Sequence, residues 1–200
     1  ERLPYCTVLM GVPTFYTRLL SFPALTPDYV NHVRMFISGS APLTEVTFRE
    51  WKEKTGVEIL ERYGMSETII NTSNPLDGER VAGTVGFPLP GLNLRISDSE
   101  GKELPRGEIG TIEVSGPAVM KGYWRMPEKT KEEMRQDGYF ITGDLGVQDE
   151  EDRVSIVGRG KDLVISGGFN VYPKEIESVI DELLGVQECA VIGVPHADFG

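Results

Sequence analysis

The residues that set the fold class are Met35–Tyr63, which read MFISGSAPLTEVTFREWKEKTGVEILERY. The apolar run Met35–Ser38 predicts one buried strand, and Val57–Leu60 predicts another. Between them, Thr44–Thr55 predicts a helix whose first residue is a favourable N-cap, and Gly56 follows as a favourable stop. A helix between two strands predicts a largely parallel sheet, so the predicted fold class is α/β.

Residues on either side of this stretch extend the prediction. Upstream, Cys6–Met10 is apolar enough for another buried strand. Downstream, Leu92–Ile96 and Ile109–Val114 alternate apolar and polar residues, which is typical of half-buried strands in a small β-rich subdomain. Pro127–Met134 predicts a short surface helix.

The last part of the chain predicts the opening of a second domain near residue 160. Glycines divide Val154–Val171, a stretch that is otherwise typical of strands. Apolar residues at helical spacing then predict a helix that begins at Pro173 and stops at Gly185. The apolar run Val186–Val194 predicts a further strand.

The composition argues against several classes of function. With 20 Lys and Arg against 31 Asp and Glu, the net charge is -11, and the backbone of a nucleic acid would be repelled. Cys6 and Cys189 have no Cys or His neighbour at metal-ligand spacing, which disfavours a zinc site or a Cys–His nucleophile. No apolar run approaches the roughly 18 residues that suggest a membrane span, and we expect a cytoplasmic protein.

Three segments carry residues suited to chemistry, and the first is Tyr63-Gly64-Met65-Ser66-Glu67. A flat aromatic ring beside a glycine can lie against a base while the backbone comes close to the ligand. The hydroxyl and the carboxylate that follow could contact a phosphate and its magnesium ion. A strand-to-helix turn with a surface glutamate is the alternative.

The other two segments lie further along the chain. In Tyr139-Phe140-Ile141-Thr142-Gly143-Asp144, the Asp follows a buried strand and could accept hydrogen bonds from two ribose hydroxyls, although an ordinary turn fits as well. Gly158-Arg159-Gly160-Lys161-Asp162 continues through Gly167-Gly168 to Glu177, and glycines around charged residues allow the torsion changes of a hinge. The spacing matches neither a P-loop nor a dinucleotide fingerprint.

The three segments, in this order and at these separations, resemble the adenylate-forming superfamily of acyl-CoA synthetases, adenylation domains and luciferases. Ser38–Leu43 is similar to the adenine-side loop of that superfamily, so the resemblance extends over essentially all 200 residues. Within the superfamily, Glu61–Met65 and Gly158–Glu177 look most like bacterial malonyl-CoA synthetases.

The resemblance implies ATP, Mg2+ and coenzyme A as ligands. The residues expected to surround adenine are Gly39, Ala41, Pro42 and Tyr63. Ser66, where the family usually has Thr, would touch the α-phosphate, and Glu67 would hold magnesium.

The resemblance also implies roles for the later segments. Asp144 and Arg159 would bind the ribose hydroxyls. Lys161 would be the hinge, and Gly167 and Gly168 would line the path of pantetheine after the small domain rotates. The residues expected to act in catalysis are Ser66, Glu67 and Lys161.

Arg62 indicates the class of substrate. The position before the Tyr-Gly pair would border the acyl pocket, and a guanidinium there suits a second carboxylate, as in malonate or methylmalonate. Pairing of Arg62 with Glu61 or Glu67 is the structural alternative. The implied activity is that of an ATP-dependent acid–thiol ligase, which adenylates a small dicarboxylate and passes the acyl group to coenzyme A.

The expected domains are residues 1–158, the C-terminal part of the large AMP-binding domain, and residues 163–200, the start of the small domain. A β-rich subdomain would occupy about 82–157, and 159–162 would be the hinge. The family's phosphate loop would precede Glu1 and its adenylating lysine would follow Gly200, so we expect the 200 residues alone to be inactive. Another short-chain acyl-CoA ligase, a peptide-synthetase adenylation domain, a luciferase-like enzyme and a non-catalytic nucleotide-binding protein remain alternatives.

Overall fold

A computed structural model describes residues 5–186, 189–197 and 199 of the chain. The chain divides into two compact units, Glu1–Leu92 and Asn93–Gly200. Each unit has its own sheet, and the fold is a mixed α/β one with a parallel sheet and antiparallel sheets, as the sequence predicts. The predicted domain limits, with a hinge at 159–162, stay a prediction.

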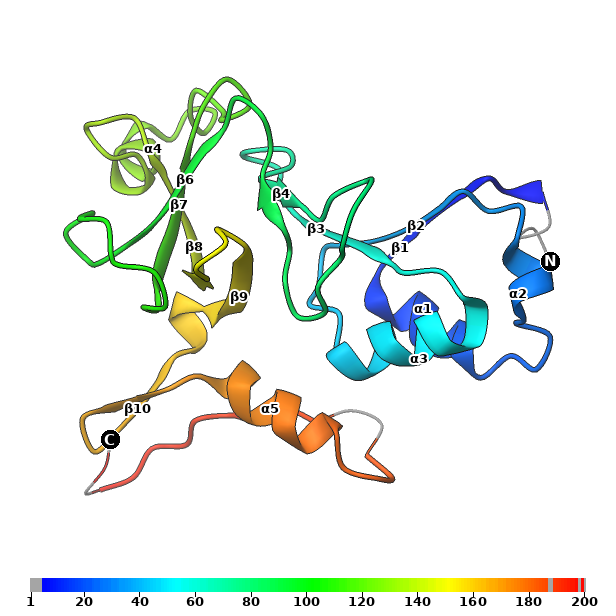
Figure 1. Ribbon diagram of the computed structural model, residues 1–200. Helices are drawn as coiled ribbons and strands as arrows, with labels where there is room; N and C mark the ends of the chain where they lie inside the picture. Colours follow the sequence, from blue (N-terminus) through cyan, green and yellow to red (C-terminus); the bar gives the residue numbers. More distant parts are fainter. Residues whose placement is uncertain (1–4, 187–188, 198, 200) are drawn as a thin grey trace. The chain divides into compact units, whose positions relative to one another are not determined.

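The first unit is built on a five-stranded sheet in the order β1-β2-β3-β4-β5. Its strands are β1 (Val8–Gly11), β2 (Met35–Ser38), β3 (Leu60–Tyr63), β4 (Thr72–Ser73) and β5 (Phe87–Pro88). The first three strands run parallel, and the pairs β3–β4 and β4–β5 are antiparallel. The helices of this unit are α1 (Pro13–Leu20), α2 (Pro27–Val30) and α3 (Glu45–Thr55), and Figure 1 shows α1 and α3 on one side of the parallel strands.

Aromatic packing holds these helices against the sheet. Trp51 of α3 is fully buried, and its ring centroid lies 5.0 Å from that of Tyr16 in α1 and 5.0 Å from that of Phe36 in β2. Both contacts are edge-to-face, an arrangement that stabilises aromatic pairs beyond their buried area. The Tyr16 hydroxyl donates a hydrogen bond of 2.6 Å to the Ile37 carbonyl, while its burial raises the pKa of the phenol above the ordinary value.

Local chemistry explains the ends of α3 and the start of β3. The Thr44 side chain accepts from the Thr47 amide, and Gly56 follows the last turn in the left-handed region, so both predicted helix ends are confirmed. The predicted third strand, Val57–Leu60, is displaced, because β3 begins at Leu60. The Val57 amide donates to the Thr55 hydroxyl at 3.2 Å, which keeps Val57 in the turn after the helix.

The second unit contains a four-stranded antiparallel sheet, β6-β7-β8-β9, and a separate hairpin, β10–β11. The bounds are β6 (Asn93–Ser97), β7 (Gly110–Ser115), β8 (Phe140–Gln148), β9 (Val154–Arg159), β10 (Val164–Ser166) and β11 (Phe169–Val171). Its helices are α4 (Pro127–Glu133), the one-turn 3-10 helix η2 (Gly160–Asp162) and α5 (Pro173–Asp181). The predicted β-rich texture and the short surface helix are therefore present.

Two predictions near the end of the chain were wrong. The helix that begins at Pro173 ends at Asp181, before Gly185. The apolar run Val186–Val194 forms no strand over its described residues, and residues 187–188 lie outside the described part. The Val191 amide donates instead to the Glu177 carboxylate of α5 at 3.0 Å.

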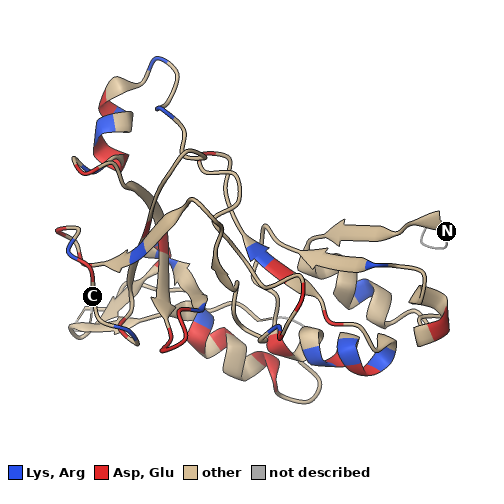
Figure 2. Ribbon diagram, turned by 45° about the horizontal axis from the view of Figure 1, so that its top comes forward, with Lys and Arg blue, Asp and Glu red and all other residues tan. Residues whose placement is uncertain are grey.

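The distribution of charge is that of solvated helix faces. Figure 2 shows acidic and basic residues interleaved along α3 and α4. Over the part of the chain that the structure describes, no helix combines the length and the apolar character needed to cross a bilayer.

We predict that Trp51→Ala lowers the free energy of unfolding by about 3–5 kcal/mol, because it leaves a cavity between α1, β2 and α3. The matched control on the same helix is Glu53→Ala, an exposed position where the change should stay within about 0.5 kcal/mol. Urea unfolding of both variants of the full-length protein measures the difference. Equal effects would contradict this assignment of the core.

Candidate functional site

Two loops of the first unit leave the same edge of the sheet. Residues 39–43 follow β2 and residues 64–71 follow β3, and because these strands are parallel neighbours their carboxyl ends lie side by side. Ligands of open α/β sheets bind at this edge. The loop after β2 also lies against the end of β3, since a Cβ built on Gly39 would lie 3.1 Å from the Arg62 carbonyl oxygen.

The residues predicted to surround adenine thus lie along this edge of the sheet. Tyr63 is the last residue of β3 and is buried, whereas Ala41 and Pro42 are exposed in the loop after β2. The loop is fixed by Glu61, which is buried and accepts a hydrogen bond of 3.0 Å from the Leu43 amide. The sequence did not predict that Glu61 would hold this loop. The available signal was an acidic residue directly after the apolar run Val57–Leu60.

The loop after β3 folds back tightly on its own start. The Met65 carbonyl accepts from the amides of Thr68 (3.1 Å) and Ile69 (2.7 Å), which places Ser66 and Glu67 in the turn. A Cβ on Gly64 would lie 2.0 Å from the Ile69 carbonyl oxygen, so only glycine fits. Ile69 has a φ of 65°, a strained conformation for a β-branched residue, and such strain is often found at functional sites.

In this turn the Ser66 residue is exposed and Glu67 is half-buried. The Ser66 hydroxyl could donate a hydrogen bond to a phosphate, and the Glu67 carboxylate offers a hard oxygen ligand that suits a magnesium ion. Among the described residues there is no cluster of three or more His, Cys, Asp or Glu side chains that could hold a metal ion by themselves. Mg2+ in proteins is usually held by one or two carboxylates together with water and substrate phosphates.

Arg62 lies in β3 directly before Tyr63 and is half-buried. Its Nη2 atom donates to the Sδ atom of Met10 in β1 at 2.9 Å, and this acceptor is neutral. Within the described part of the chain, no ion pair joins Arg62 to a carboxylate. The predicted roles of Arg62, Tyr63, Ser66 and Glu67 stay predictions, but the structure places all four on one strand and the turn that follows it.

In the second unit, the two residues predicted to bind ribose face each other. Asp144 of β8 is paired in register with Arg159 of β9, and the Arg159 Nε atom lies 2.8 Å from the Asp144 Oδ1 atom. The Asp144 side chain is 6% exposed and that of Arg159 is 52% exposed. The pair thus has a fixed carboxylate and an accessible guanidinium, a geometry that can present hydrogen-bonding groups to a polar ligand.

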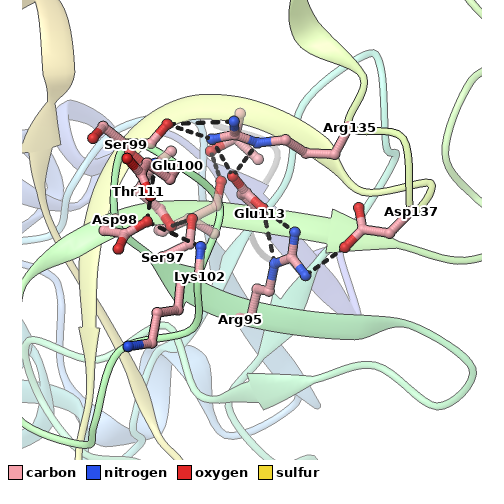
Figure 3. Close-up of polar contacts among 12 residues, drawn as sticks. Arg95, Ser97, Asp98, Ser99, Glu100, Lys102, Thr111, Glu113, Arg135 and Asp137 are labelled. Carbon is pink, nitrogen blue, oxygen red and sulfur yellow. Dashed lines mark hydrogen bonds and ion pairs between the residues drawn. The ribbon is translucent and has the colours of Figure 1, made fainter.

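A buried carboxylate anchors the sheet that carries Asp144. Figure 3 shows Glu113 of β7 between Arg95 and Arg135. Glu113 is fully buried, and each oxygen is held by two guanidinium nitrogens of one arginine at 2.7–2.8 Å. Arg95 also binds Asp137 at 2.7 Å, which holds the pKa of that carboxyl below its ordinary value. The Arg95 guanidinium carbon lies 3.8 Å from the Tyr139 ring centroid. These contacts tie the entry of β8 to β6 and β7.

The remaining predicted residues lie after β9. Lys161 is exposed in the turn η2, and Gly167 and Gly168 form the exposed turn between β10 and β11. Both glycines have positive φ, and the Gly167 amide donates to the Phe199 carbonyl at 3.0 Å. Within the described residues, no hydrogen bond joins Lys161 to the Gly167–Gly168 turn. The roles of these three residues stay predictions.

Comparison with known proteins defines the class to which this geometry belongs. The sequence pattern of the AMP-binding enzyme family matches residues 5–124, more than half of the chain, and the chain belongs to that family. The match includes both loops at the edge of the parallel sheet.

Several relatives of the chain are CoA ligases. A malonate–CoA ligase of Arabidopsis thaliana is 41% identical over 97% of this chain and 33% of its own length. A long-chain-fatty-acid–CoA ligase of Yersinia pestis is 37% identical over 98% of this chain and 35% of its own length. The crystal structure of ATP-bound MatB from Rhodopseudomonas palustris superposes with a TM-score of 0.95 at 70% identity, over 97% of this chain and 39% of that one. The chain spans about a third of the curated relatives.

We predict that Glu113→Ala lowers the free energy of unfolding by about 3–5 kcal/mol, because it leaves Arg95 and Arg135 without their shared buried partner. The matched control is Glu103→Ala in the same unit, where the side chain is 60% exposed and pairs with Arg106 at 4.0 Å. This control should change stability by less than about 1 kcal/mol. Chemical denaturation measures both, and a Glu113 variant as stable as the control would refute the anchoring role.

Proposed function

We propose that the protein is an ATP-dependent acid–thiol ligase that adenylates a small dicarboxylate, malonate or methylmalonate, and transfers the acyl group to coenzyme A. AMP and pyrophosphate would be released. The observation that carries the proposal is the position of Arg62, half-buried beside Tyr63 at the ligand-binding edge of an AMP-binding fold. The similarity to malonate–CoA ligase and MatB supports the same substrate class.

The electrostatics of Arg62 favour a substrate with a second carboxylate. Its neighbour Met10 is neutral, so the guanidinium charge is not cancelled at that contact. A charge-assisted hydrogen bond to the distal carboxylate is worth about 1.5–3 kcal/mol. At about 1.4 kcal/mol per factor of ten, this gives on the order of a 10- to 100-fold preference over a monocarboxylate.

The proposed chemistry has two steps. In the first, a carboxylate oxygen of the acid attacks the α-phosphorus of ATP, the bond to pyrophosphate breaks, and an acyl adenylate forms. In the second, the thiol of coenzyme A attacks the acyl carbon, and AMP leaves with the electron pair of the broken anhydride bond. Ser66 would donate to the α-phosphate, and Asp144 with Arg159 would hold the ribose hydroxyls.

The turn after β3 suits a magnesium ion. The Glu67 carboxylate is half-buried and offers a hard oxygen ligand, with the exposed Ser66 residue beside it. One or two carboxylates together with nucleotide phosphates are the usual protein environment of Mg2+. The ion would neutralise charge on the phosphates when bound.

We further propose that one site serves both steps by domain alternation. Residues 1–158 would belong to the large domain and 163–200 to the small one, with Lys161 as the hinge in the turn η2. An exposed single turn between two strands can change its backbone torsions without unpacking a core. Rotation would bring the Gly167–Gly168 turn to the path of pantetheine.

The test of substrate class measures AMP release by the full-length protein with ATP, coenzyme A and malonate, methylmalonate, acetate or octanoate. We expect Arg62→Ala to lower kcat/KM for malonate by about 10- to 100-fold and to leave acetate little changed. The control is Arg34→Ala, an exposed arginine just before β2, at the opposite end of the strands.

Each other result of this test points to a different function. Octanoate turned over better than malonate would support a monocarboxylate ligase, an option favoured by the similarity to long-chain-fatty-acid–CoA ligases. Unchanged malonate activity in Arg62→Ala would remove the role of the arginine. No AMP release with any acid would leave a non-catalytic nucleotide-binding protein.

A second prediction concerns the ribose. Asp144→Ala should weaken ATP binding by about 10- to 100-fold, because a charged acceptor for the ribose hydroxyls is lost. The wild type should bind ATP better than 2′-deoxy-ATP, and the variant should lose that preference. Calorimetric titration measures both affinities, with Glu150→Ala, an exposed acid in the turn after β8, as control. A variant that retains the full preference would exclude this contact.

A further inference from the structure

The strand that carries Asp144 is irregular on both of its edges. On the β7 side, Thr111 pairs with Leu145 but Glu113 pairs with Ile141, so residues 142–144 face Ile112 alone. On the β9 side, the register shifts between Leu145 and Gly146. Bulges of this kind leave ladder groups unpaired, and they occur next to active sites, where they re-aim a side chain.

A single hydroxyl restores the hydrogen bonds at the bulge. The Thr142 Oγ1 atom donates to the Ile112 carbonyl at 2.8 Å and accepts from the Asp144 amide at 3.1 Å. Thr142 is 5% exposed, so water has little access to these groups. Between the two bonded residues, Gly143 has a φ of 76°, which a residue with a Cβ would adopt only with strain.

Asp144 is consequently held at two points. The Thr142 hydroxyl holds its backbone amide, and the Arg159 guanidinium holds its carboxylate. Without the hydroxyl, the Asp144 amide would lose its hydrogen bond to Thr142, and the backbone that sets the direction of the carboxylate would be less restrained.

We propose that Thr142 is the residue that positions Asp144 for nucleotide binding, through its hydroxyl. The inference rests on the proposed function, because the expected ligand of Asp144 is the ribose of ATP. Thr142 acts through Asp144 and is not itself a ligand of the nucleotide.

The chain offers a closely matched control. Thr55 is 2% exposed, and its hydroxyl donates to the Trp51 carbonyl at 2.7 Å and accepts from the Val57 amide two residues on at 3.2 Å. Thr55→Val and Thr142→Val therefore each remove a buried hydroxyl that bonds a backbone carbonyl and a backbone amide, and the Thr55 hydroxyl also lies 3.3 Å from the Val57 carbonyl. Only the bonds of Thr142 include Asp144.

The experiment uses the full-length protein in four forms: wild type, Thr142→Val, Thr142→Ser and Thr55→Val. Hydrogen exchange of the segment 140–148 is measured without ligand, and the affinities for ATP and 2′-deoxy-ATP are measured by calorimetry. We expect Thr142→Val to speed exchange, to weaken ATP binding by about tenfold and to weaken 2′-deoxy-ATP binding less, because that nucleotide keeps only the 3′-hydroxyl. Thr142→Ser, which keeps the hydroxyl, should restore both readings, and Thr55→Val should bind ATP as the wild type does.

Three outcomes would overturn the inference: unchanged exchange in Thr142→Val, equal weakening by Thr55→Val, or no rescue by Thr142→Ser. Equal loss of affinity for both nucleotides would also overturn it, because that result indicates general destabilisation. If the wild type binds no ATP while exchange still rises in Thr142→Val alone, the proposed function fails and the positioning of Asp144 by Thr142 stands.

Discussion

Burial of the Trp51 indole between α1 and β2 is the constraint on which the first unit depends. The contacts with Tyr16 and Phe36 hold α3 against the sheet, and α3 is the crossover that returns the chain as β3, parallel to β2. Parallel neighbours have their carboxyl ends at one edge. The loops that start at Gly39 and Gly64 therefore leave the same edge of the sheet because apolar packing holds the crossover helix in place.

The sheet of the second unit is held together by ion pairs around a buried carboxylate. Glu113 is buried in the middle of β7, and a buried charge is tolerated only where its oxygens are well bonded. The forks of Arg95 and Arg135 meet this need, and they come from either side of β7 in the sequence. Ion pairs thus tie the start of β8 to β6 and β7, whereas apolar packing holds α3 against the sheet of the first unit.

The sequence predicted well those features that local chemistry decides. Thr44 and Gly56 marked the ends of α3 because capping needs only neighbouring residues. It predicted poorly those that depend on competition between distant groups. The Val191 amide bonds to the Glu177 carboxylate instead of to a neighbouring strand, and a pattern of apolar residues cannot predict such a contact.

The candidate site likewise has features that the sequence predicted and features that it did not. The resemblance placed Asp144 and Arg159 in one role, and the structure pairs them directly. The bulge at 142–144 could not be predicted, because register depends on pairing with a strand that lies far away in the chain. A glycine within a strand, Gly143, was its one local signal, since such glycines often mark bulges.

The bulge also explains how a stable sheet can carry a functional carboxylate. A regular antiparallel ladder would bond the amides of β8 alternately to β7 and β9, and its side chains would follow the pleat without local adjustment. Where residues 142–144 face Ile112 alone, the regular pairing of β8 with β7 is interrupted, at a cost in backbone hydrogen bonds. The Thr142 hydroxyl offsets that cost within the strand itself, so Asp144 is held in place beside the irregular pairing. A carboxylate fixed in this way loses little conformational freedom when it meets a ligand, which is the requirement for a preorganised binding residue.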